Sequence, residues 1–260
     1  TPESPMAIPV VHSLEHYAAS GALDRLDALR ADPDFRTDPR VRSAGLAEVR
    51  DLIESHPIAP ELVTSIESYI EEHYGRDTRV RFRSSSNTED LPGFNGAGLY
   101  VSLSVQLSDS NRQVADVLRA VWASLYYDRA YDERAYHNIA QDGVAMGVLV
   151  HPAFLSEAVN GVAIGRNILE PIRDQDYINV QFGEASVANP SPGVTTEQLI
   201  YDQRRTPRLQ VLGRSNLTGG KPVVSEGEAG RISCTLRSIQ THFRPLIDPN
   251  NENRWFAMDI

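Results

Sequence analysis

Cysteine, lysine and long apolar runs are what this chain has least of. Cys234 is the single cysteine among 260 residues, which excludes an intrachain disulfide and a cluster of thiolate metal ligands. This scarcity favours a cytoplasmic location, and residues 1–5 lack the basic and apolar parts of a signal sequence. No apolar run approaches the length that crosses a bilayer, so we expect no membrane partner. We interpret Cys234 as a small buried apolar side chain.

The positive charges are almost all arginines. Lys221 is the only lysine among 25 lysines and arginines, so a mechanism that needs a lysine has one candidate. Its Gly-Gly-Lys-Pro context lacks P-loop spacing, and we interpret it as a solvated loop lysine. The formal net charge of −10 argues against nonspecific binding to nucleic acid, although a local cationic pocket is compatible with that total.

Apolar residues at helical spacing dominate the N-terminal part, residues 1–79. Leucines three apart predict a helix over 22–29, and a similar stripe predicts another over 44–55. A third helix is predicted over 60–75, with proline at its start and glycine at its end. A short strand that enters a helix is expected over 7–17. This part is therefore expected to be mainly helical.

From residue 80 onward the pattern changes to strands and two long helices. One helix is predicted over 111–138, where we interpret Arg129 and Arg134 as surface residues paired with neighbouring carboxylates. A second is predicted over 228–246, and the change in pattern near residue 140 is a candidate subdomain boundary. The predicted strands, which we expect to form one mainly antiparallel sheet, are 144–150, 161–164, 177–181, 198–201, 209–212 and, at the end of the chain, 254–260.

Residues 80–100 have the most unusual composition. Apolar residues alternate with arginines at the start, as in a half-buried strand, and three serines follow. Glycines at 93, 96 and 98 permit positive φ and a close backbone approach, so successive N–H groups can converge on an anion. Arg83 stands at the mouth of that loop, where a guanidinium is suited to clamp phosphate oxygens. The alternative is an ordinary turn that leads to a strand predicted over 101–105.

One signature is contained in the run from Arg83 to Tyr100, RSSSNTEDLPGFNGAGLY. It resembles the PEP/pyruvate-binding ATP-grasp nucleotide-binding domain of the pyruvate phosphate dikinase and phosphoenolpyruvate synthase type, whose relatives include rifampicin phosphotransferase and glucan water dikinase. This resemblance implies an α+β, ATP-grasp-like fold in which a helical N-terminal part precedes a mainly antiparallel sheet with flanking helices. Residues 80–260 would form the nucleotide-binding subdomain. Further motifs follow in the family's order at 121–130, 144–151, 160–164, 181–185 and 256–260.

The resemblance also implies roles for individual residues. Arg83 would contact ATP phosphates and stabilise charge during transfer. Asp259 would be a ligand of Mg²⁺. The other nucleotide-binding positions that it implies are Ser84; Gly96, Ala97, Gly98, Leu99 and Tyr100 in a lid-like loop; Val150, His151 and Ala153 beside adenine; and Glu184.

Some positions depart from the family's pattern. His151 stands where family members usually have glutamine, and the loop at 96–100 is closer to the glucan dikinase type than to the synthases. No lysine precedes Lys221, and Ile260 is the last residue before the point where the family's metal-binding glutamate would follow. We therefore expect an incomplete magnesium site and little turnover. We interpret the seven histidines as surface or structural residues, because none stands in the context of the family's phosphate-carrying histidine.

These observations leave three hypotheses. In the first, the chain is the ATP-binding portion of a dikinase-like phosphotransferase, and the full protein also has a swivelling phosphohistidine domain and an acceptor domain. In the second, it is a degenerate ATP-grasp module with a binding, scaffolding or regulatory role. The third is unrelated chemistry on the same fold, with Glu89 and Asp90 as an acid–base pair. That pair is disfavoured because adjacent residues on an extended chain point to opposite faces.

Overall fold

Two compact units make up the chain, Thr1–Ala153 and Phe154–Ile260. The computed structural model describes residues 5–91, 94–96, 98–154, 157–188, 190–205 and 208–260. Both units combine helices with antiparallel strands, so the predicted α+β class is confirmed. In the part of the chain that the model describes, no helix is both long and apolar enough to span a membrane.

Two helices of the first unit begin at an aspartate cap. Asp32 and Asp38 accept hydrogen bonds from backbone N–H groups two residues later, and each precedes a proline at the first helical position. Proline also begins the helix that follows Ala59. The helices of this unit are α1 (Val10–Ala19), α2 (Ala22–Ala31), α3 (Pro33–Thr37), α4 (Pro39–Ser55), α5 (Pro60–His73), α6 (Val114–Ala123), the 3₁₀ turn η1 (Ser124–Tyr126) and α7 (Asp128–Tyr136).

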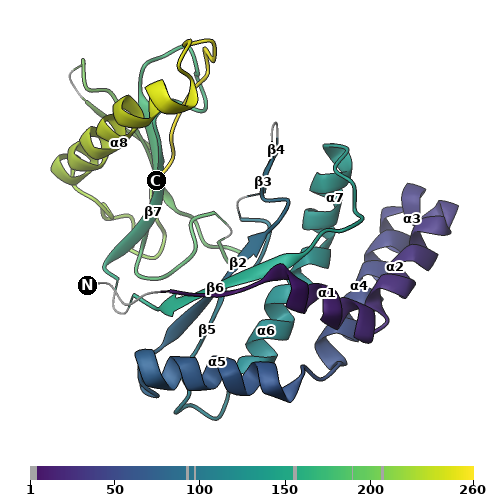
Figure 1. Ribbon diagram of the computed structural model, residues 1–260. Coiled ribbons are helices and arrows are strands. Elements are labelled where there is room, and N and C mark those ends of the chain that lie inside the picture. The colour runs from purple at the N-terminus through teal and green to yellow at the C-terminus, as the bar shows by residue number, and fades with distance from the viewer. Residues whose placement is uncertain (1–4, 92–93, 97, 155–156, 189, 206–207) are drawn as a thin grey trace. The chain divides into compact units, whose positions relative to one another are not determined.

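A four-stranded antiparallel sheet, in the order β1-β6-β2-β5, forms the centre of this unit (Figure 1). Its strands are β1 (Met6–Ile8), β2 (Val80–Ser86), β5 (Leu103–Val105) and β6 (Met146–Pro152). The pairing of β2 with β6 extends over seven residues, from Val80 opposite Pro152 to Ser86 opposite Met146. These two strands therefore determine which side chains of the sheet share a face.

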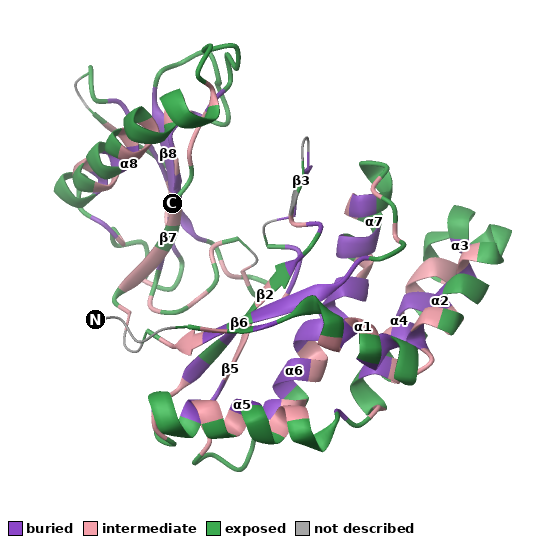
Figure 2. Ribbon diagram, in the orientation of Figure 1, coloured by how far each residue is buried: buried purple, intermediate pink, exposed green. Residues whose placement is uncertain are grey.

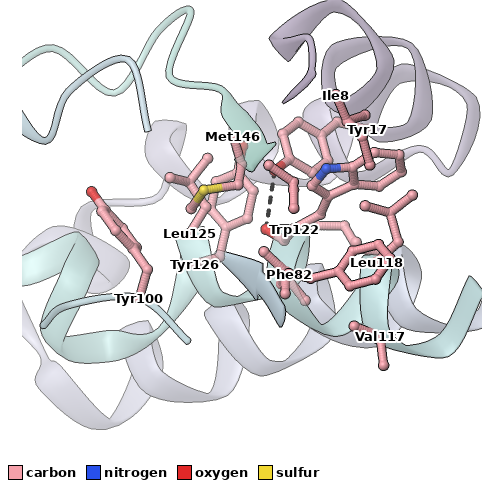
Figure 3. Close-up of a cluster of buried hydrophobic side chains, with 14 of the residues drawn as sticks. Ile8, Tyr17, Phe82, Tyr100, Val117, Leu118, Trp122, Leu125, Tyr126 and Met146 are labelled. Atoms are coloured by element: carbon pink, nitrogen blue, oxygen red, sulfur yellow. Dashed lines mark hydrogen bonds between the residues drawn. The ribbon is translucent and has the colours of Figure 1, made fainter. Parts of the chain in front are cut away.

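One face of this sheet packs on helices. Phe82 on β2 is buried with Leu118 and Trp122 of α6, and Figure 2 shows much of α6 as buried. The cluster is close-packed around Trp122 (Figure 3), whose carbonyl oxygen accepts a 3.0 Å hydrogen bond from the Tyr17 hydroxyl of α1. Helices α1 and α6, which are far apart in the sequence, thereby pack in the same core.

The single long helix predicted over 111–138 is wrong. It is interrupted between α6 and α7, because Tyr127 adopts an extended backbone at φ −65° and ψ 142°. The Ser124 hydroxyl donates to the Val121 carbonyl at 2.6 Å and accepts from the Val101 N–H at 3.3 Å. A side chain that bonds backbone in this way competes with helix continuation.

The second unit is a separate antiparallel sheet with one long helix. Its strands, in the order β10-β9-β8-β7, are β7 (Val159–Ile164), β8 (Asp176–Phe182), β9 (Glu197–Tyr201) and β10 (Leu209–Gly213). Helix α8 (Glu226–Ile247) begins with a capping box in which the Ser225 and Glu228 side chains each bond the other's backbone N–H.

Three expectations need correction in this half of the chain. The strand predicted over 144–150 belongs, as β6, to the first unit's sheet, so the predicted strands do not form one sheet. Residues 254–260 are not a strand and form only a bridge between Asp259 and Ile164. Cys234 is exposed on α8 and is not a buried apolar residue.

Acidification should destabilise the first unit through His16. Its Nε2–H donates to the Ile53 carbonyl at 2.8 Å, and burial lowers the pKa of His16 below its usual 6.5. The stabilisation from the neutral ring is therefore complete above about pH 6.5 and is lost as the pH falls through the folded-state pKa. Urea unfolding at about pH 7.5 and about pH 5 should show a larger loss of stability for the unmodified chain than for His16→Gln, which does not titrate. Equal losses would contradict this assignment.

Candidate functional site

Arg83 lies on the open face of the first unit's sheet. Arg81, Arg83 and Ser85 alternate with the buried residues of β2 and are exposed, so they share the face opposite the helical core. Across the strand pair, Arg83 is opposite Leu149 and Arg81 is opposite His151. Leu149 is 37% exposed, an unusual degree of exposure for a leucine in the middle of a sheet. We name this surface, made of Arg81, Arg83, Ser85, Leu149 and His151, the arginine face.

The ionisable side chains of the arginine face are two arginines and one histidine. The four strands of this sheet, MAI, VRFRSSS, LSV and MGVLVHP, contain no carboxylate. Arg81 donates to the Ser104 hydroxyl at 3.3 Å. The face therefore provides a local cationic surface on a chain whose net charge is −10.

Ser84, which the resemblance placed at the nucleotide, lies on the other side of β2 from Arg83. Its backbone N–H donates to the Ser102 hydroxyl at 3.2 Å, and the two hydroxyls are 3.4 Å apart. These contacts continue the connection between β2 and the residues that precede β5, beyond the last ladder pair at Phe82 and Leu103.

The glycine-containing loop begins as a hairpin of two very short strands, β3 (Asp90–Leu91) and β4 (Phe94–Asn95). Gly96 follows it and donates to the Glu89 carbonyl at 2.7 Å. A Cβ at Gly96 would lie 3.1 Å from the Glu89 Cα, so this close backbone approach favours glycine. Gly98 has φ +75°, the left-handed region that also favours glycine, and Ala97 lies outside the described residues.

Leu99 and Tyr100, the last two residues of the predicted lid, have buried side chains. They belong to the hydrophobic core of the first unit, and Tyr100 is only 9% exposed. The Tyr100 hydroxyl accepts a 3.3 Å hydrogen bond from the Arg134 guanidinium. These two residues therefore anchor the loop to the core.

The segment that the resemblance placed beside adenine is the end of β6. Val150 is fully buried among core residues, and its carbonyl is 3.5 Å from the Tyr74 hydroxyl. The Ala153 N–H donates to the Arg79 carbonyl at 2.7 Å, so this amide is already engaged within the unit. His151 Nδ1 donates to the Pro152 carbonyl at 2.7 Å, which places the ring proton of the neutral imidazole on Nδ1.

Two predicted positions belong to the second unit. Glu184 is exposed in the turn after β8, where Gly183 has φ +66°. The Asn160 amide holds this turn by donating to the carbonyls of Gly183 and Ala185 at 2.6 and 2.9 Å. Asp259 is exposed at its bridge to β7. The described residues among the predicted set from Arg83 to Ala153 all belong to the first unit, whereas these two belong to the other.

The described residues do not fit a magnesium site. Among them no group of three or more histidine, cysteine, aspartate or glutamate side chains is arranged to hold a metal ion. Asp259 is therefore a single carboxylate without partner ligands in that part of the chain, and one carboxylate is a poor site for a hard divalent cation.

The sequence-based interpretation of Arg134 as a surface residue is wrong. Its side chain is 0% exposed, and its hydrogen-bond partners are Tyr100, Leu125 and Gln141. The signal that could have indicated burial is its spacing, because it lies four residues after the buried Ala130 on one face of α7.

Comparison with known proteins identifies the family. The model of the pyruvate phosphate dikinase, AMP/ATP-binding domain family matches residues 12–230. The chain belongs to this family. The match covers both the arginine face and the second unit's sheet, so the resemblance found in the sequence is confirmed.

Curated relatives of this family member include two phosphoenolpyruvate synthases. The protein from Deinococcus radiodurans is 30% identical over 141 residues, which is 52% of this chain and 17% of the relative. The probable phosphoenolpyruvate synthase of Methanothermobacter thermautotrophicus is 28% identical over 240 residues, 82% of this chain and 33% of the relative. A rifampicin phosphotransferase from Bacillus cereus is 25% identical over 173 residues, 64% of this chain and 20% of the relative. The chain thus spans a third or less of the length of these relatives.

Gly96→Ala should destabilise the first unit, because the new methyl group would press on the Glu89 backbone, which cannot rotate away as a side chain can. We expect a loss of about 1–2 kcal/mol in the free energy of unfolding, measured in urea. Gly213→Ala is the matched control, since its Cβ would make only a 4.0 Å contact, and its effect should stay within about 0.5 kcal/mol. A Gly96→Ala effect as small as the control's would refute the steric argument.

Proposed function

We propose that this chain is the ATP-binding portion of a dikinase-like phosphotransferase. The observation that carries the proposal is the location of Arg83, on an exposed sheet face without carboxylates, in a chain whose family is an AMP/ATP-binding domain. A guanidinium there can bind two phosphate oxygens at once and stay charged at every physiological pH. Its role would be to hold the phosphate chain and stabilise negative charge as the phosphoryl group moves.

In the complete protein, the phosphoryl group would pass from ATP to a histidine of a separate swivelling domain and then to an acceptor. A ring nitrogen of that histidine would bond to phosphorus while the bond between phosphorus and the nucleotide oxygen breaks. The relatives are much longer than this chain, which leaves room in such proteins for the phosphohistidine and acceptor domains. The names of those relatives, phosphoenolpyruvate synthase and rifampicin phosphotransferase, support phosphoryl transfer as the class of reaction.

Within this chain, the residues proposed to contact nucleotide fall into two groups. Around the phosphates we propose Arg83 and the backbone around Gly96 and Gly98. For the adenine we propose the end of β6, where the His151 imidazole is half-buried on the arginine face. Magnesium would be held by the ATP phosphates, because the described residues offer it no cluster of ligands.

A second candidate function is a degenerate ATP-grasp module that binds a partner or regulates an enzyme without catalysis. Two observations favour it. The described residues contain no cluster of metal ligands, and the only lysine, Lys221, is exposed on a loop. This candidate predicts that ATP does not raise the melting temperature, whereas binding to the folded state must raise it by linkage.

Arg83→Met should weaken ATP binding by about tenfold or more, since it removes a charged, bidentate contact worth roughly 1.5–3 kcal/mol. Isothermal titration with ATP and magnesium measures the dissociation constant directly. Arg76→Met is the control, because Arg76 is exposed, pairs with Glu71 and lies outside the arginine face. If the Arg83 variant binds ATP as well as the unmodified chain does, Arg83 has no role in phosphate binding.

A further inference from the structure

Arg134 is the one fully buried arginine among the described residues. Its guanidinium makes three hydrogen bonds inside the first unit. Nε donates to the Gln141 side-chain oxygen at 3.0 Å, one Nη donates to the Tyr100 hydroxyl at 3.3 Å, and the other donates to the Leu125 carbonyl at 2.8 Å. Every one of these acceptors is neutral.

The carboxylates on the same helix have other partners. Asp128 lies 3.1 Å from Arg50, Asp132 lies 2.7 Å from Arg42, and Glu133 lies 3.9 Å from His137. Within the described residues, Arg134 therefore has no ion-pair partner. Because arginine does not lose its proton in proteins, a full positive charge is buried there without a counter-ion.

Such a charge is costly. Burying an ion without a partner costs several kcal/mol even after relaxation, and neutral hydrogen bonds offset only part of that. An apolar side chain on this face of α7 would fill the space at lower cost. The cost indicates that the charge has a use beyond packing.

The hydrogen bond from Arg134 to the Tyr100 hydroxyl indicates what the buried charge is used for. Tyr100 ends the loop that contains Gly96 and Gly98, and its ring anchors that loop in the core. Arg134 is therefore buried in the core that anchors the loop, and it holds the end of the loop through the tyrosine hydroxyl. Its field is weakly screened there, because protein rather than water surrounds it.

We propose that Arg134 is a positioning residue for the phosphate groups of the nucleotide. This inference rests on the function proposed above, and it assigns to a buried residue a role in selecting the charged part of the ligand. Arg134 orders the loop through Tyr100 and adds positive potential behind it, so it strengthens the binding of phosphates and leaves the binding of a nucleoside unchanged.

The test compares affinities for ATP and for adenosine, because the ratio of the two isolates the contribution of the phosphates. Arg134→Met should lower that ratio by about tenfold, with the dissociation constant for adenosine changed by less than about twofold. Tyr100→Phe, which removes only the hydroxyl, should lower the ratio by about threefold. Arg134→Lys keeps the charge and should retain more of the ratio than Arg134→Met does.

Arg129→Met is the matched control, since Arg129 is exposed on the same helix and its replacement removes the same charge. Its ratio should equal that of the unmodified chain. An unchanged ratio in Arg134→Met, or an equal loss of affinity for ATP and adenosine, overturns the inference and leaves a purely structural residue. Urea unfolding shows whether Arg134→Met is folded. If it is not, the ratio of the affinities for ATP and adenosine in Tyr100→Phe and Arg134→Lys tests the inference instead.

The two proposals fail in different ways. If the unmodified chain binds neither ATP nor adenosine, the proposed function fails, and the inference about Arg134 fails with it. If the unmodified chain prefers ATP and every Arg134 and Tyr100 variant keeps that preference, the proposed function stands and only the inference about Arg134 is refuted.

Discussion

The pairing of β2 with β6 is the constraint on which the first unit depends. Seven consecutive residue pairs fix Phe82 opposite Val150 on the helical side and Arg83 opposite Leu149 on the open side. Because side chains alternate strictly along a strand, a slip of one residue would bury both arginines and expose the phenylalanine. The hydrophobic core and the arginine face are thus two results of a single register.

Much of this arrangement could be predicted from local patterns. The alternation at 80–83 predicted both the strand and the exposure of its arginines, and the prolines and glycines predicted helices near the ones observed. The break between α6 and α7 could not be predicted in this way, because the apolar spacing continues across it. Near the break, the Ser124 hydroxyl accepts from the Val101 N–H, a contact between residues 23 positions apart.

The same distinction between local patterns and long-range contacts applies to the residues of the candidate site. Arg83 could be predicted because its role depends on sequence context and strand period, both local. The partners of Arg134 could not, since they come from the loop before β5, from η1 and from the segment before β6. Charged residues on a helix are usually solvated, and only the tertiary fold shows that this face of α7 is covered. The predicted lid is a similar case, since the apolar character of Leu99 and Tyr100 is compatible with a surface loop as well as with the core.

The use of arginine rather than lysine has a consequence for regulation. The arginine face has no amine side chain, so acetylation, which removes charge from lysines, has no target there. A guanidinium, unlike an amine, also does not lose its proton in proteins. The cationic character of this surface is thus protected from two common ways in which cells alter protein charge.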